Sequence, residues 1–598
     1  MFLSSFLIAA GLLTAETPDT LQAVTIVADK GFVVSRTDTV SIADDIATVA
    51  DALLRLPALA LSDFGGPAGL KSVSMRGLGS AHTDIYLDGV RVSNFQSGQN
   101  DLGMLPLEML GSAVADYAQN TLSFRTARPV FGDSPFAGRL RLQAASFGTR
   151  MPSVRFDIRA SERVAISAHA AGILTRGDFP YGEDGARREG NDLRQLRAGY
   201  DVFGSMRGGE WQVKSYINAS DRGTPGPLSW PSEDRQRDKN AVVQGSMRKA
   251  FSDRYTLNLS AKGAYDDVFY RSAWGDSDYG FSDFQLNSAH SFRLTERWDV
   301  SAAADLERGV LRASDYAAAR TAAIAAIGTA LRLDRFRAAL ALEYRGTFDR
   351  GAAARHCLSP SLELRVGLGE ELELVGFGRR AFRAPTFNEL YFPGYGNPDL
   401  RPEDAWLSDL GIAWHRGSGR GWTFDAKADL FYNILQDKII SAPSEADPYL
   451  WLPYNIGRVE AAGADASLSA RHAGDAWSGG FSARYAWQSA LDKTPDSATF
   501  GSQVPYVARH TVSLAADASW RGWRADALWS RRGGRFDAAG ELPAWSSLDL
   551  SLRKSFAAGN CELGLFVSGR NLLDCRYELV RDYPMPGRNL LGGIEFKF

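Results

Sequence analysis

Features that mark enzymes, nucleic-acid-binding proteins and helical membrane proteins are scarce in this sequence. The 598 residues include only three cysteines, Cys357, Cys561 and Cys575, and their spacing fits no metal site, so we expect three free thiols. No internal run of 18 apolar residues occurs, which argues against a transmembrane helix. The formal net charge is −3, which gives no reason to expect a nucleic-acid partner. We find no nucleophile motif, phosphate loop or zinc spacing, and we expect no enzyme activity.

Glycine and aromatic residues are plentiful, and apolar residues alternate with polar ones over long stretches. The chain has 59 Gly, 14 Trp and 20 Tyr. In 422–432, one face carries Trp, Phe, Ala, Leu and Tyr while the other carries Thr, Asp and Lys. The stretches 255–262 and 547–553 alternate in the same way. Period-2 alternation predicts strands with one apolar and one polar face.

This alternation continues from about residue 136 to the last residue. A soluble β-sandwich also alternates, but repetition over more than 400 residues favours a membrane β-barrel, whose closure pairs every strand edge. The Ala-rich stretch 317–331 has two interpretations, a helix or a loop followed by a strand, and we favour the second. The fold class predicted is an all-β membrane barrel of residues 133–598, preceded by a smaller α+β domain.

The first 30 residues are predicted to lie outside both domains. Residues 1–15 combine an apolar core with small residues at their end, which is typical of a secretory signal peptide; the alternatives are a misplaced start codon or a buried apolar segment. Residues 16–30 form a polar arm with a β-prone run at Val24–Val27. Such an arm can add as a strand to the sheet edge of a partner.

Residues 31–132 contain the patterns of a small mixed domain. Apolar residues recur at helical spacing over 44–57, which predicts a helix ended by Pro57. Two extended runs, 72–76 and 84–88, end in the pairs Arg76-Gly77 and Asp88-Gly89, where glycine permits positive φ. If these runs form an antiparallel pair, the loops 63–71 and 90–103 emerge at the same end.

Several motifs carry a resemblance to the TonB-dependent outer-membrane receptors. The stretch 72–90, with its RG … DG pair, resembles the plug domain of these receptors, which sits inside the barrel. Residues 382–391 (FRAPTFNELY) and 396–403 (GNPDLRPE) resemble their mid-barrel signature. Further matches along the barrel are Asn455, Gly457, Gly463, Pro505, His510, Asn571–Asp574 and Tyr577. The text RGLGSAHTDIYLDGVRVSN is similar to that of the family's cobalamin transporters, and the resemblance weakens after Leu105.

The resemblance implies an architecture, a location and partners. It implies about 22 antiparallel strands in a Gram-negative outer membrane, a plug over 31–132 and a monomeric barrel in contact with lipid. The arm 16–30 would contain the TonB box, bound by TonB that ExbB and ExbD energise, with residues Asp19, Thr20, Leu21, Val24 and Thr25. Phe598, the last residue, resembles the signal read during outer-membrane barrel assembly.

The resemblance also implies binding and import of a scarce solute, for which no cofactor is required. The plug loops would form the floor of the ligand cavity; the alternative is that they are ordinary surface loops. Their candidate ligand residues are Phe64, Gly65, Gly66, Ser93, Asn94, Phe95, Gln96, Ser97, Gln99 and Asn100. We expect cobalamin or a related corrinoid; the alternative within the family is a ferric siderophore. A passive or protein-binding barrel is an alternative of another class, and a surface lipoprotein lid is a further possible partner.

Acidic clusters in two predicted outer loops suggest a cation site. Asp178, Glu183, Asp184 and Asp192 lie close together in sequence, as do the aspartates at 266, 267, 276 and 278. Carboxylates in a glycine-containing loop can bind Ca²⁺. A solvated acidic loop, neutralised by Arg187 and Arg188, is the alternative.

Overall fold

The computed structural model describes residues 37–598, with the exception of 43–47, 57, 93, 183, 419–420, 445–449 and 538. The predicted signal segment 1–15 and the arm 16–30 with its TonB box lie outside the described residues. Among those residues, the structure has no helix of the length and hydropathy needed to cross a membrane.

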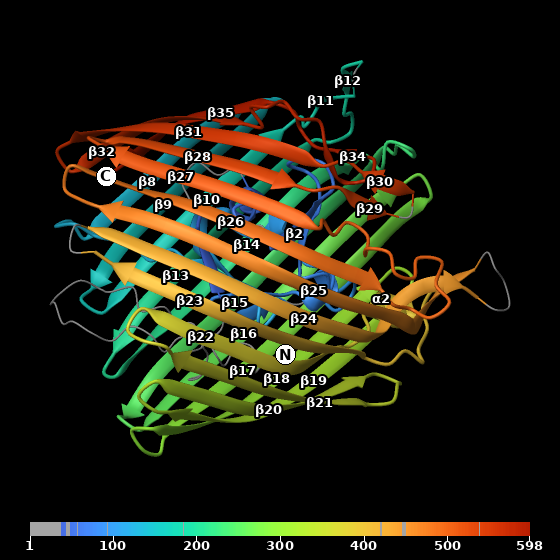
Figure 1. Ribbon diagram of the computed structural model, residues 1–598. Helices are drawn as coiled ribbons and strands as arrows, with labels where there is room; N and C mark the ends of the chain where they lie inside the picture. The colour runs from blue at the N-terminus through green and yellow to red at the C-terminus, as the bar shows by residue number, and fades with distance from the viewer. Residues whose placement is uncertain are drawn as a thin grey trace.

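The larger domain is a closed antiparallel barrel, which confirms the predicted fold class and the number of about 22 strands (Figure 1). Around the barrel each strand pairs with its neighbour in sequence, and the last strand closes on the first. The strands are β8 (Phe136–Ala145), β9 (Thr149–Ser161), β10 (Val164–Thr175), β13 (Leu193–Met206), β14 (Gly209–Thr224), β15 (Asp234–Ser252), β16 (Tyr255–Ser272), β17 (Gly275–Arg293), β18 (Trp298–Ala313), β19 (Ala317–Arg332), β20 (Phe336–Asp349), β21 (Arg355–Gly367), β22 (Leu372–Arg383), β23 (Glu403–Gly417), β24 (Trp422–Pro443), β25 (Trp451–Ala473), β26 (Trp477–Asp492), β27 (His510–Trp520), β28 (Trp523–Arg532), β31 (Trp545–Ala558), β32 (Cys561–Arg570) and β35 (Asn589–Lys597).

Burial along the barrel strands is the inverse of that in a soluble protein. In β24 the apolar Leu430 and Tyr432 are 63% and 45% exposed, whereas Asp429 and Asn433 are 6% and 2% exposed. Apolar side chains point out of the barrel and polar ones point into the lumen, against the plug. This is the pattern that a lipid environment requires of a barrel. The stretch 317–331 belongs wholly to strand β19, so the loop predicted for its first part is wrong.

Closure of the barrel brings the two ends of the domain together. Strand β35 pairs antiparallel with β8, and Phe596 is opposite Leu140. The backbone of Phe598 continues this ladder, with hydrogen bonds of 2.8 and 3.1 Å to Gly138. The Phe598 ring fills the space beside Gly138: a Cβ added there would lie 2.1 Å from the ring. The terminal residue is therefore part of the barrel seam.

The plug fills the lumen with two sheets that share no strand. Strands β1 (Thr37–Ser41), β6 (Leu110–Asp116), β7 (Thr121–Thr126), β4 (Asp84–Leu87) and β5 (Val90–Val92) form a five-stranded sheet in that order. Strands β2 (Leu59–Asp63) and β3 (Lys71–Met75) form a separate pair. The runs 72–76 and 84–88 therefore do not form the antiparallel pair on which the placement of loops 63–71 and 90–103 depended. Strand β3 pairs with β2, whereas β4 pairs antiparallel with β5 and parallel with β7.

Local sequence explains the short elements of the plug. Helix α1 (Val49–Leu53) begins after Thr48, which forms a capping box with Asp51. Of the helix predicted over 44–57, residues 44–47 and 57 lie outside the described residues. Asp88 and Gly89 have φ of 46° and 80° and form the two-residue turn between β4 and β5. The chain leaves the plug after β7 and enters the barrel at β8, and the predicted boundary near residue 132 falls between these strands.

The two ends of the barrel differ in their connections. One end, which we call the turn end, carries two-residue turns such as 207–208 and 521–522, together with the C-terminus. The opposite loop end carries the long connections, including 176–192, 384–402 and 571–588 (Figure 1). The loop-end connections contain α2 (Phe387–Tyr391) and the small pairs β11 (Pro180–Tyr181) with β12 (Ala186–Arg187), β29 (Arg535–Asp537) with β30 (Gly540–Leu542), and β33 (Glu578–Val580) with β34 (Tyr583–Pro584).

Candidate functional site

The first apical loop of the plug, residues 64–70, is shaped by a buried ion pair at its base. Asp63 and Lys71 are opposite each other in the β2–β3 pair, with Nζ 3.6 Å from Oδ2. Lys71 Nζ also donates to the carbonyls of Gly66 and Gly69, at 2.6 and 2.8 Å. Asp63 Oδ1 accepts the N–H of Gly65 at 3.0 Å. Burial raises the pKa of Asp63 to about 6, although the charge of Lys71 opposes the shift.

Outer loops cover this first apical loop. We call the covering residues the roof; they are Phe179 and Asn191 from connection 176–192, and Tyr583, Pro584 and Pro586 from connection 571–588. The side-chain amide of Asn191 donates to the carbonyl of Gly65 at 2.9 Å. The rings of Phe64 and Tyr583 pack edge to face with centroids 4.9 Å apart. Gly65 and Gly66 are both buried. This half of the predicted ligand floor is therefore closed.

The second apical loop, residues 93–100, also lies at the loop end and is more open. Asn94 Oδ1 accepts the N–H groups of Gln96 and Ser97, both at 3.1 Å, and its amide donates to the carbonyl of Gln99 at 2.7 Å. Ser97 and Gln99 are exposed, whereas Asn100 is half-buried. A loop held by its own asparagine can present exposed polar side chains in a fixed arrangement. Ser93 lies outside the described residues.

Phe95 is mostly enclosed, and it lines a small cavity together with Asn94 and Asn100. Only 8% of the residue is exposed, and its ring packs against Phe281 and Phe387 with centroids 6.0 and 6.1 Å apart. Gly309 of β18 provides the space: a Cβ there would lie 2.2 Å from the Phe95 ring. The Phe95 carbonyl also accepts the N–H of Phe387 at 2.7 Å. Phe95 thus anchors the second apical loop to the barrel wall.

The Arg76-Gly77 pair fastens the plug to one side of the barrel. The guanidinium of Arg76 lies 2.6 Å from Asp409 on β23 and 3.0 Å from Asp465 on β25. Burial opposes its charge, but the two carboxylates outweigh this effect and raise the pKa of Arg76. Gly77 sits directly against the wall, since a Cβ there would lie 2.5 Å from that of Ala490.

The Asp88-Gly89 pair fastens the plug to a different part of the wall. The ammonium of Lys214, on β14, forms an ion pair with Asp88 and lies 3.4 Å from Asp201. Asp88 Oδ1 also accepts the N–H of Thr126 at 2.9 Å, which ties the β4–β5 turn to strand β7. Lys214 is 1% exposed, so this charge is fully enclosed between the plug and the wall.

The barrel residues that hold the plug were not predicted from the sequence. Lys214, Asp409 and Asp465 are lumen-facing members of alternating strands, and dozens of polar residues share that local pattern. The one available signal was the charge of the plug motifs, which requires buried partners of opposite sign somewhere on the wall. Asn455, a family-motif residue, holds the 384–402 connection by accepting the N–H of Arg401 at 2.7 Å.

Asp178, Asp184 and Asp192, the described carboxylates among those predicted to bind Ca²⁺, have separate partners. Asp178 lies 3.3 Å from Arg187, and Asp192 lies 3.0 Å from Arg235. Asp184 accepts the N–H of Ala186 at 3.2 Å, and Glu183 is outside the described residues. Within the described ranges, no three His, Cys, Asp or Glu side chains are placed to hold a metal ion. Arg187 thus neutralises one of these carboxylates, whereas Arg188 donates to the carbonyl of Gly226 and Arg235 pairs with Asp192 instead.

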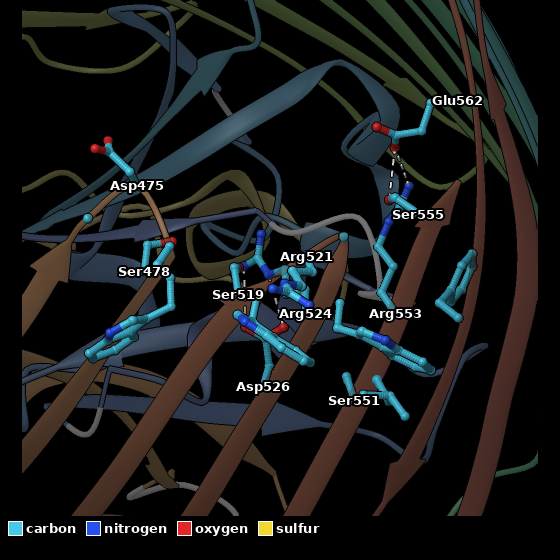
Figure 2. A pocket seen from close by; sticks show the side chains of 18 of the residues that line it. Asp475, Ser478, Ser519, Arg521, Arg524, Asp526, Ser551, Arg553, Ser555 and Glu562 are labelled. Atoms are coloured by element: carbon cyan, nitrogen blue, oxygen red, sulfur yellow. Dashed lines mark hydrogen bonds and ion pairs between the residues drawn. The ribbon is translucent and has the colours of Figure 1, made fainter. Parts of the chain in front are cut away.

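A cavity of about 430 Å³ lies at the turn end, at the opposite end of the barrel from the apical loops. Barrel residues of strands β26 to β35 and their turns line it (Figure 2). Two ion pairs lie among its charged residues: Arg524 lies 3.1 Å from Asp526, and Arg553 lies 3.5 Å from Glu562. None of the predicted ligand residues lines this cavity, so it does not replace the apical loops as the candidate site.

Two family models match the chain and together cover most of it. "TonB dependent receptor-like, beta-barrel" matches residues 114–572, and "TonB-dependent Receptor Plug Domain" matches residues 32–115. The curated relatives include "Vitamin B12 transporter BtuB" of Vibrio vulnificus (strain YJ016), which is 23% identical over 593 residues. That alignment covers 93% of this chain and 90% of the relative. The protein of the same name from Photobacterium profundum is 24% identical over 246 residues, covering 40% of this chain and 37% of the relative.

Solved structures share the fold at low sequence identity. The FrpB iron transporter from Neisseria meningitidis (F3-3 variant) superimposes with a TM-score of 0.77 at 12% identity. The copper transporter OprC gives 0.76 at 15% identity. Each comparison covers 94% of this chain and 99% of the other. At such identities the likeness concerns the architecture of barrel and plug.

Proposed function

We propose that this chain, which belongs to the TonB-dependent receptor family, imports cobalamin or a related corrinoid. The family match establishes the coarser function: the chain is a TonB-dependent receptor of the Gram-negative outer membrane. Related proteins are transporters and receptors rather than enzymes. Outer-membrane barrels place their longer loops outside the cell, so the apical loops face the outside. The plug fills the lumen, which disfavours the alternative of a passive channel.

One observation carries the choice of solute. The relative that aligns with 93% of this chain is a vitamin B12 transporter, and the alignment includes both plug and barrel. The iron and copper transporters among the structural neighbours share only the fold, so they do not support a metal complex as the solute.

The charge of the mouth supports the same choice. The eleven connections at the loop end contain seventeen Asp and Glu against eleven Lys and Arg. A field of this sign repels the polyanionic complexes that many ferric siderophores form, whereas it leaves the approach of a neutral corrinoid unaffected. The exposed Ser97 and Gln99 would hydrogen-bond the amide side chains of a corrinoid.

Energy for import would come through the N-terminal arm. Family membership implies an interaction with TonB, for which we propose Asp19, Thr20, Leu21, Val24 and Thr25 as the binding strand. ExbB and ExbD, which would energise TonB, belong to the same proposal. A surface lipoprotein over the mouth is a separate hypothesis that no described contact supports.

Equilibrium binding to the purified receptor tests the solute. We expect cyanocobalamin to bind with a nanomolar to low-micromolar Kd, which corresponds to about 8–12 kcal/mol. Ser97→Gly together with Gln99→Gly should weaken binding at least tenfold, whereas Ser229→Gly, in an exposed outer loop, should not. Absence of binding at 100 µM, with and without Ca²⁺, would overturn the corrinoid assignment. A panel of ferric siderophores measured in parallel would then identify the alternative ligand.

A further inference from the structure

We propose that Tyr583 determines access to the candidate site, because its ring covers Phe64 of the first apical loop, where a solute would bind. A solute must displace this ring before it can contact Phe64 and the glycines that follow. The inference rests on the proposed function, since it names a residue that controls solute entry at the same site.

The roof satisfies the groups of the loop that a solute would otherwise contact. The Phe64 ring already has an aromatic partner, because the Tyr583 ring lies edge to face with it at 4.9 Å. The Gly65 carbonyl already has a donor, the amide of Asn191 at 2.9 Å. The backbone around Gly65 and Gly66 is enclosed by Pro584 and Pro586. Apolar and polar contacts that a ligand would supply are therefore made by the protein itself.

The roof is attached to other outer loops and to the plug, where Leu579 of β33 packs in the hydrophobic core. The β33–β34 hairpin is held by Arg535, which donates to the carbonyl of Glu578 at 2.7 Å. Arg581 pairs with Asp537 at 2.6 Å, and the carbonyl of Asp582 accepts the N–H of Leu228 at 2.9 Å. Figure 1 shows β34 beside β29 and β30 at the loop end. None of these attachments uses a barrel strand ladder, so displacing the hairpin leaves the ladder intact.

The two apical loops differ in exposure, and this difference predicts the order in which a solute contacts them. Ser97 and Gln99 of the second loop are exposed, whereas Gly65 and Gly66 of the first are buried under the roof. An arriving solute therefore meets the second loop first. It reaches the first loop only if it can replace the ring contact on Phe64 and the hydrogen bond to Gly65.

This requirement selects a class of solute. The replacement needs an apolar surface at least the size of one ring, next to groups that can donate hydrogen bonds. A corrinoid, with its broad ring and amide side chains, has both. A small hydrophilic molecule lacks the apolar surface and would leave Tyr583 in place.

Cysteine labelling tests the roof without any solute. Pro67→Cys places a thiol in the first apical loop, at a half-buried position, in a background where Cys357, Cys561 and Cys575 are serine. We expect a maleimide to label this thiol at least tenfold faster when Tyr583→Ala is added. Tyr583→Phe should label as slowly as the parent, since the ring remains. Tyr395→Ala, an outer-loop tyrosine whose hydroxyl contacts Ser441, is the matched control and should change nothing. Equal labelling rates with and without the Tyr583 ring would overturn the proposal.

Binding kinetics connect the roof to solute entry. Cyanocobalamin should associate at least fivefold faster with the Tyr583→Ala receptor than with the parent, because the open form is no longer a minor state. Equal association rates would show that the ring is not in the path of the solute, and would also overturn the proposal. If labelling accelerates but neither receptor binds cyanocobalamin, the role of Tyr583 as a cover is supported and the corrinoid assignment is refuted. Retained heat-modifiable mobility of the barrel on gels would show that each variant is folded.

Discussion

Arg76 Nη2 donates to Asp465 Oδ2 at 3.0 Å, although 389 positions separate the two residues in the chain. Asp409 binds the other side of the same guanidinium, and all three side chains are 3–5% exposed. The plug is therefore fastened by a buried charge between two carboxylates of the barrel wall. Any movement of the plug that frees a solute must separate these charges or carry them past each other.

Loss of this arginine should loosen the plug. Arg76→Met would remove the cation between the buried Asp409 and Asp465, at a cost of about 3–5 kcal/mol. Faster hydrogen exchange of the plug amides would show this, with the barrel amides as an internal reference. Arg128→Met is the matched control, since Arg128 also joins plug to barrel through Glu210 but is 22% exposed. It should cost about 1 kcal/mol or less. Equal effects of the two variants would contradict the special role of Arg76.

The barrel could be predicted from sequence because its signal is local and repeated. Alternation such as Asp429, Leu430 and Tyr432 reports the two faces of each strand directly, and closure then follows from the need to pair every edge. The strand pairing of the plug was harder to predict from the sequence. Strand β4 pairs in parallel with β7, and nothing in the residues 84–87 indicates that partner. Chain neighbours suggested a β3–β4 hairpin, but the turn after Arg76 packs against the barrel wall instead.

The C-terminal residue should matter more for assembly than for binding. Deletion of Phe598 removes the ring that fills the space beside Gly138 and two backbone hydrogen bonds at the seam. We expect less folded protein in the outer membrane and unchanged solute affinity in the molecules that do fold. Gly138→Val should reproduce this defect by displacing the same ring. Wild-type levels of folded receptor for both variants would contradict this role.

The stability of the plug should depend on pH through Asp63. Its folded pKa of about 6 lies above the ordinary value of 3.8, so the native state holds its proton more tightly than the unfolded chain. The resulting stabilisation is complete below pH 3.8 and is lost as the pH rises through 6, by about 3 kcal/mol in all. Asp63→Asn mimics the protonated group and should remove this dependence. Hydrogen exchange of residues 64–70 at pH 4.5 and pH 7 measures it; an unchanged pH response in the variant would count against it.

The candidate site could be predicted only in part from the sequence, because some of its contacts join residues that are far apart in the chain. The polar character of Asn94, Ser97 and Gln99 identified the second apical loop, because exposure and hydrogen bonding follow from residue type. The packing of Phe95 against the wall could not be predicted, because an aromatic residue in a loop fits a ligand and a wall pocket equally well. The pocket is created by Gly309, more than 200 positions away. The roof could not be predicted from the sequence, because Tyr583 and Phe64 are far apart in the chain and come into contact only when the barrel closes.

Proline in the N-terminal arm should separate binding from transport. Leu21→Pro or Val24→Pro would remove a backbone donor from the strand proposed to pair with TonB. We expect uptake to be lost while the affinity for cyanocobalamin stays the same. Thr17→Pro, earlier in the arm and before the proposed strand, is the control and should transport normally. Normal uptake in both strand variants would exclude this stretch as the TonB contact.

The most direct test of energised corrinoid import is uptake of labelled cyanocobalamin by cells that lack their own transporter. The chain should restore accumulation above the level of surface binding when TonB is present. Without TonB, surface binding should persist while accumulation is absent. Equal accumulation with and without TonB would contradict energised transport, and no accumulation or binding in either strain would contradict the corrinoid assignment.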